Sequence, residues 1–130
     1  MRISKKSIAV GVLAASLVLG GAASAQAGTT LQGFNLVAPK FQYPVYTAGQ
    51  TKAISSFYGL LDQVTTGGGY QVNAKECVGS DVSCGSTVTV NGGAHLPNNI
   101  SAGTLHVVAQ MWVNTFNFVS VSVAGYWASN

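Results

Sequence analysis

Apolar and polar residues alternate along much of the chain, a pattern that restricts those segments to extended strands. Between residues 105 and 113 the odd positions are all apolar, whereas His106, Gln110 and Trp112 occupy even positions. Successive side chains of a strand point to opposite faces. We therefore expect one strand here, with its odd positions in the core and with His106, Gln110 and Trp112 on the opposite face.

The same pattern predicts further strands elsewhere in the chain. They are expected over residues 29–37, 41–47, 70–75, 88–90 and 116–123. The last of these needs one extra residue near Phe118 and Val119, a β-bulge that turns Phe116, Phe118 and the following valines toward the core. Pro44 marks an edge strand or a bulge, because proline donates no hydrogen bond to a strand ladder.

Residues 51–64 fit two patterns. Four apolar residues follow the spacing of a helix face, namely Ile54, Phe57, Leu61 and Val64. The first half of the segment also favours extended structure, so we interpret it as a strand, with a short helix as the alternative. About seven short strands joined by glycine-rich turns predict an all-β fold, a small antiparallel β-sandwich or a partly open barrel. The phenylalanines expected in its core are Phe34, Phe57, Phe116 and Phe118.

The chain has two cysteines, Cys77 and Cys84, which lie between the strands predicted at 70–75 and 88–90. Exported chains meet oxidising conditions in which such a pair closes. We expect a disulfide that clamps the end of a hairpin formed by these two strands. No histidine or further cysteine lies at zinc-like spacing from the pair, so we expect neither a metal site nor a cofactor.

The amino terminus has the three parts of a cleavable signal peptide of bacterial style. A basic start is followed by an apolar stretch over residues 8–19, and Ala25-Gln26-Ala27 supplies small residues for cleavage. The apolar stretch is shorter than the ~20 residues of a membrane-spanning helix. We predict cleavage after Ala27. Residues 28–130 are then expected to form a single secreted domain, without a transmembrane segment, that acts at the cell envelope or in the medium.

The distribution of charge argues against nucleic acid as a partner. The formal net charge of +3 comes from Arg2, Lys5 and Lys6, which all lie in the predicted signal peptide. Beyond it, lysines and carboxylates balance and arginine is absent, the charged residues being Lys40, Lys52, Lys75, Asp62, Glu76 and Asp81. Nucleic-acid binding needs clustered Lys and Arg to neutralise phosphates. A neutral partner is therefore expected.

The residues available for catalysis are few. His95 or His106, with Asp62 or Asp81 and a serine, would complete a catalytic triad, but no nucleophile-elbow signature accompanies them. Glu76 and Asp81 flank the cysteine loop, where solvated turn residues are common. We therefore predict a protein that is not an enzyme and has no catalytic residues.

Aromatic residues with polar edges are the strongest indication of function. Trp112 shares its predicted face with His106 and Gln110, while Tyr126 and Trp127 lie near the carboxyl terminus, where we expect them to reach the surface. Such residues bind neutral partners by stacking and hydrogen bonding. These five residues form the predicted binding surface for a glycan or a protein, unless Trp112 lies under a second layer. The alternatives are a bacteriocin-like toxin acting on competing cells, or an inhibitor that presents the cysteine loop to a secreted hydrolase.

Overall fold

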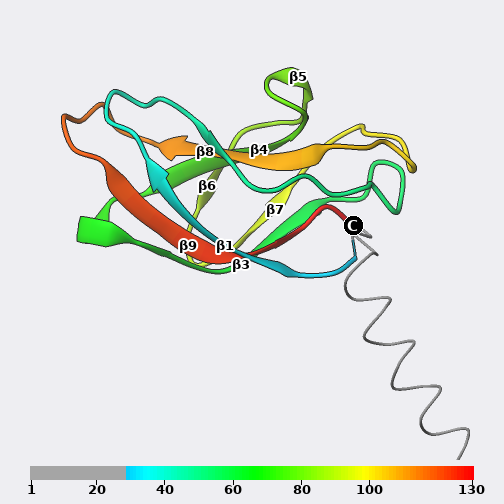
Figure 1. Ribbon diagram of the computed structural model, residues 1–130, viewed down its shortest axis with the longest axis horizontal. Coiled ribbons are helices and arrows are strands. Elements are labelled where there is room, and N and C mark those ends of the chain that lie inside the picture. The colour runs from blue at the N-terminus through cyan, green and yellow to red at the C-terminus, as the bar shows by residue number, and fades with distance from the viewer. Residues whose placement is uncertain (1–28) are drawn as a thin grey trace, which may run out of the picture.

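The computed structural model describes residues 29–130, and the predicted signal peptide, residues 1–27, lies outside them. The described residues form strands in two antiparallel sheets that pack face to face (Figure 1), which confirms the predicted all-β sandwich. The sheets do not close into a barrel over this part of the chain. Within residues 29–130, no helix has the length and apolar character needed to cross a membrane.

Each sheet is named here after its most central long strand. The β9 sheet has the order β1 (Gln32–Ala38), β9 (Val121–Ala128), β3 (Gly59–Thr66), β7 (Ala94–Leu96). The β8 sheet has the order β2 (Val45–Tyr46), β8 (Val107–Val113), β4 (Val72–Val78), β5 (Val82–Cys84), and β6 (Val88–Val90) also pairs with β4. One short 3-10 turn, η1 (Gly67–Gly69), connects β3 to β4.

The core lies between the two sheets and follows the predicted alternation of β8. Val107, Ala109, Met111 and Val113 are all fully buried on its inner face. Leu105, however, is 60% exposed, so the expectation that it faces the core is wrong. The strand begins only at Val107, because His106 adopts a left-handed backbone conformation with φ 57° that extended structure does not allow.

The hairpin around the cysteines is confirmed. Strand β4 pairs with β6, with Val72 opposite Val90, and Cys77 and Cys84 form a disulfide between β4 and β5. The predicted strand at 41–47 shrinks to the two residues of β2, which lies at the edge of its sheet directly after Pro44. The missing N–H of proline is tolerated at such an edge.

The strand and bulge predicted over residues 116–123 are wrong for residues 116–120, whereas Val121 and Val123 belong to β9 and are buried as expected. Phe116, Phe118 and Val119 are 61%, 76% and 49% exposed, and β9 begins only at Val121. The Asn117 side chain accepts a hydrogen bond from the Val119 N–H (3.3 Å), which folds the segment into a loop instead of a strand. Phe116 and Phe118 therefore point away from the core.

Two further expectations about burial are corrected. Phe57 is 40% exposed, while Phe34 is partly buried and packs against the core. Trp127 is only 1% exposed because it projects from the central strand β9 into the core between the sheets, opposite Gln32 and Leu61 in the strand ladder. The expectation that it reaches the surface is therefore wrong.

The segment 51–64 divides into two parts. Its second half belongs to β3, which begins at Gly59, so the strand interpretation is correct there. Residues 51–58 form a loop, apart from an isolated bridge pairing at its start, and neither the strand nor the helix predicted for them is present. Hydrogen bonds to other loops hold this segment, for example from the Ser56 N–H to the Ile100 carbonyl (2.9 Å).

Candidate functional site

Strand pairing places a set of polar and aromatic side chains on the outer face of the β8 sheet. Trp112 lies opposite Asn73, and Gln110 lies opposite Lys75 on one side and Tyr46 on the other. Since the neighbouring residues Met111 and Ala74 face the core, these side chains share the face that points away from it. The even positions of β8 therefore lie where the alternation predicted.

This face is hollowed into a groove, called here the Trp112 groove. It has a volume of about 390 Å³ and is lined by Gln42, Pro44, Lys75, Asp81, Gln110 and Trp112. Trp112 is half-buried, and Gln110 is 4% exposed at the base. The loop before edge strand β2 contributes Gln42 and Pro44 to one side, and the turn between β4 and β5 contributes Asp81. Aromatic, amide and charged groups thus converge on one open site.

The charges in the groove compensate each other. The Lys75 ammonium lies 3.4 Å from a carboxylate oxygen of Asp81 and 5.7 Å from the centre of the Trp112 ring. Lysine over an indole face is attracted by the ring electrons. Burial raises the pKa of the Tyr46 phenol, and the charge of Asp81 and a hydrogen bond to it act in the same direction. The phenol therefore stays protonated and donates to Asp81, leaving the site without net charge.

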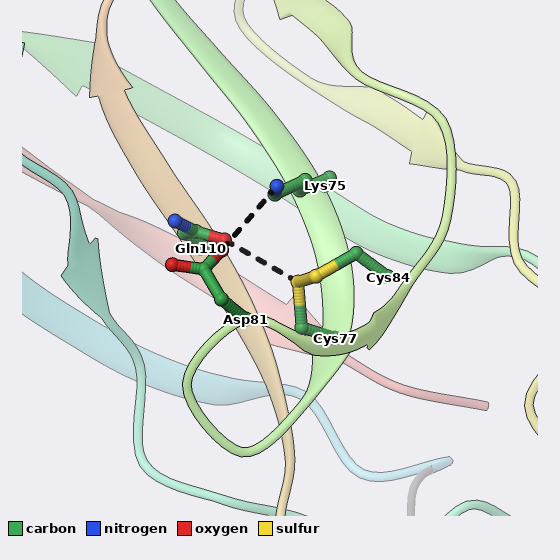
Figure 2. The surroundings of a disulfide bond; sticks show 5 residues. All are labelled: Lys75, Cys77, Asp81, Cys84 and Gln110. Atoms are coloured by element: carbon green, nitrogen blue, oxygen red, sulfur yellow. Dashed lines mark hydrogen bonds and ion pairs between the residues drawn. A yellow bond between two sulfur atoms is a disulfide. The ribbon is translucent and has the colours of Figure 1, made fainter.

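The disulfide supports the side of the groove that carries Asp81. Cys77 is fully buried, and the Gln110 side-chain oxygen lies 3.3 Å from its sulfur (Figure 2). Asp81 follows in a tight turn with φ 60°, and the Cys77–Cys84 bond joins the two strands that carry this turn. The turn and β5 rise from the outer side of the sheet (Figure 1). The bond thereby fixes the position of Asp81 relative to Lys75 and Gln110.

The same turn holds a cluster of potential metal ligands. Among residues 29–130, ligand atoms of Cys77, Asp81 and Cys84 lie within 4.8 Å of one another. The two sulfurs are bonded to each other, and metal binding requires thiolates. The cluster is therefore explained by the disulfide.

The structure separates the other predicted binding residues from Trp112 and Gln110. His106 is exposed in the turn before β8, where its carbonyl accepts from the Gly79 N–H (2.8 Å). Tyr126 is 45% exposed on the outer face of the β9 sheet, on the opposite side of the sandwich, and Trp127 is in the core. One part of the predicted surface, Trp112 with Gln110, forms a groove, and the other three residues lie elsewhere.

Sequence reasoning missed the residues that complete the groove. Lys75 and Asp81 were treated only as balancing charges and turn residues, although the hairpin around the cysteines already placed them close together. Pro44 was interpreted only as the mark of an edge strand or bulge, and Gln42 was given no role. Their position next to Trp112 depends on β4 and β2 both pairing with β8, which no local pattern reveals.

Glu76 differs most from its expected setting. It was expected to be a solvated turn residue, but it lies on the inner face of β4, fully buried, with one oxygen 3.1 Å from the Lys52 nitrogen. Burial raises the pKa of its carboxyl from 4.5 to about 7, against the opposing charge of Lys52 and hydrogen bonds from Lys52 and the Gly59 backbone. This buried pair is separate from the Trp112 groove, which is on the other side of the sheet.

His95, considered above as a catalytic residue, lies in β7 at the edge of the β9 sheet. Its ring stacks on Tyr58, with 3.9 Å between ring centres, and Tyr58 stacks in turn on Phe57. This stack covers the loop at 51–58.

Comparison with known proteins adds no assignment. No protein-family model matches the chain, and neither a curated protein nor a solved structure shows significant similarity to it.

Proposed function

We propose that this protein is an exported, non-catalytic binding module whose Trp112 groove takes a neutral, hydroxyl-rich ligand, a glycan at the cell envelope or in the medium. The observation that supports this most directly is the half-buried indole at the edge of a groove whose charges, Lys75 and Asp81, cancel. An indole offers a flat apolar surface on which a sugar ring can stack.

The polar groups of the groove suit such a ligand. The amides of Gln110 and Gln42 each carry donors and acceptors, and the Lys75–Asp81 pair adds one of each. Ligand sites generally combine apolar contact area with a few polar groups that fix orientation. Because Lys75 and Asp81 neutralise each other, the groove favours hydroxyl groups over phosphates or carboxylates.

A depletion assay with insoluble polysaccharides and purified cell walls tests this proposal. The protein should leave the supernatant with at least one neutral glycan, and Trp112→Ala should remain in solution. Tyr126→Ala is the matched control, because it removes an exposed aromatic from the opposite face of the sandwich. If Trp112→Ala binds to the insoluble glycan as well as the unsubstituted protein does, the groove has no role in binding.

A second candidate is a toxin directed at the membranes of competing cells, favoured by a separate observation. Phe41, Phe116 and Phe118 form a ring cluster with centres 5.3–5.5 Å apart, on two loops at one end of the sandwich (Figure 1). Lys40 lies 5.1 Å from the Phe41 ring. Aromatic residues beside a cation are typical of segments that enter the membrane interface. Dye release from anionic liposomes, lost in Phe118→Ser but kept in Trp112→Ala, would favour this candidate over the glycan module.

A further inference from the structure

Three polar side chains meet in the interior of the sandwich, away from the Trp112 groove. Lys52 comes from the loop before β3, Glu76 from the inner face of β4, and Asn98 from the segment after β7. Their exposed fractions are 1%, 0% and 8%. Burying a lysine and a glutamate away from water is costly even when they pair. Their presence in so small a core therefore calls for a role.

The Lys52 amine and the Asn98 carboxamide share two hydrogen-bond partners, Glu76 and the Phe57 carbonyl. The Lys52 nitrogen donates to Glu76 Oε1 (3.1 Å) and to the Phe57 carbonyl (2.6 Å), and also to the Ser129 carbonyl. The Asn98 Nδ2 donates to Glu76 Oε2 (2.8 Å) and to the same Phe57 carbonyl (2.8 Å). Glu76 thus holds the lysine nitrogen with one oxygen and the asparagine nitrogen with the other.

Two backbone groups complete this arrangement. The Ile100 N–H donates to Asn98 Oδ1 (3.1 Å), so it polarises the carboxamide carbonyl. Gly59 allows the Glu76 carboxylate to approach, since a Cβ at residue 59 would overlap Oε2 and lie 3.0 Å from Cδ. The result is the buried amine of Lys52, the Asn98 carbonyl with a donor on its oxygen, and the Glu76 carboxyl group, which bridges the Lys52 nitrogen and the Asn98 amide nitrogen.

The Glu76 carboxyl group lies between these two nitrogens and could carry protons from one to the other, provided that it can both gain and lose a proton. Burial raises the pKa of the Glu76 carboxyl to about 7, so both of its forms are accessible near neutral pH. The contact with Lys52 gives the proton a direct path from the ammonium to the carboxylate.

We propose that the folded chain forms an intramolecular isopeptide bond between the Lys52 side-chain nitrogen and Asn98 Cγ, with Glu76 transferring the protons. Lys52 gives a proton to Glu76 Oε1, and the neutral amine attacks Cγ to form a new C–N bond. The Ile100 N–H stabilises the negative charge on Asn98 Oδ1. Glu76 then protonates Nδ2 and takes a proton from the attacking nitrogen, so that the Cγ–Nδ2 bond breaks and ammonia leaves. No oxidant or other reactant is required.

Such a bond closes residues 52–98 into a covalent ring that contains β3 to β7 and joins the loop before β3 to the segment after β7. The crosslink would lie beside Glu76 on the inner side of β4, whereas the disulfide starts from the next residue, Cys77, on the outer side. Unlike the disulfide, it would persist under reducing conditions.

Intact-mass spectrometry of the exported protein tests the proposal. The mass should be lower than that of the mature chain by about 17 Da for ammonia, in addition to the two hydrogens lost in the disulfide. Peptide mapping should find one branched peptide that joins Lys52 to Asn98. An unreacted mass for the folded wild-type protein overturns the proposal. Loss of ammonia mapped to a succinimide at Asn98 and Asn99 overturns it as well.

Variants separate the contribution of each group. Glu76→Gln removes proton transfer with little change in shape and should give the unreacted mass, as should Asn98→Ala. Asn99→Ala changes an exposed neighbour and should keep the loss of ammonia. A crosslink in Glu76→Gln contradicts the assigned role of Glu76. Because the wild-type mass is decisive by itself, poor folding of a variant does not leave the proposal untested.

Discussion

The pH dependence of stability gives a quantitative prediction about Glu76. Its carboxyl has a pKa near 7 in the folded protein against an ordinary 4.5, chiefly because burial disfavours the charged form. Between these two values the folded state binds more protons than the unfolded state, so the free energy of unfolding falls as pH rises. The stabilisation is fully present below pH 4.5 and is lost by about pH 7.

The size of this effect follows from the shift. Each pKa unit corresponds to about 1.4 kcal/mol, so the contribution of Glu76 across this window is at most roughly 3–4 kcal/mol. Urea unfolding at closely spaced pH values measures it in the Asn98→Ala background, which keeps the Lys52 ammonium uncrosslinked, with the disulfide intact. The other titrating groups are removed from the comparison by subtracting the profile of Glu76→Gln in the same background, which should lack this slope. Asp62→Asn alters a carboxyl at the surface and should keep it.

Two results would refute this reasoning. Stability that rises between pH 5 and 7 would mean that the ion pair with Lys52, rather than burial, controls the carboxyl. A slope in Glu76→Gln equal to that of the unsubstituted protein would mean that another group is responsible.

Three further substitutions test the burial assignments by urea unfolding. Trp127→Ala should lower the free energy of unfolding by roughly 3–5 kcal/mol, because it empties a fully buried site; a loss below about 1 kcal/mol is incompatible with a core position. Gly59→Ala should cost roughly 1–3 kcal/mol because its Cβ overlaps the Glu76 carboxylate, and a neutral effect argues against that close approach. Phe118→Ser should change stability by no more than about 0.5 kcal/mol, since the ring is 76% exposed; a large loss would return it to the core.

The architecture could be predicted because strand alternation reports directly on burial. For this reason the predictions that the odd residues of β8 face the core and that β4 pairs with β6 were correct. Alternation fails where the chain leaves the sheet. Phe116 and Phe118 show the same spacing as a strand, yet Asn117 folds them into a loop. Trp127 was misplaced for the opposite reason, since proximity to the chain end was taken as exposure although β9 is a central strand.

The site could be predicted only in part. One strand sufficed to place Gln110 and Trp112 on a common face, but their neighbours come from other strands, and pairing between distant segments leaves no local signature. Glu76 is a different case. The run of Val72 and Ala74 already assigned even positions of β4 to the core, and Glu76 continues it. Its charge suggested solvent, whereas a buried partner, Lys52, allows it to remain inside.

The measurement that tests the central claim most directly is a paired determination of stability and glycan affinity for Trp112→Ala. The indole is half-buried and its ring lies 5.7 Å from the Lys75 ammonium, so removing it should lower the free energy of unfolding by about 1 kcal/mol. Its affinity for a glycan that the unsubstituted protein retains should fall at least about tenfold, equivalent to about 1.4 kcal/mol. The opposite result, unchanged affinity with a loss of stability of roughly 3 kcal/mol or more, would make Trp112 a structural residue and contradict the proposed groove.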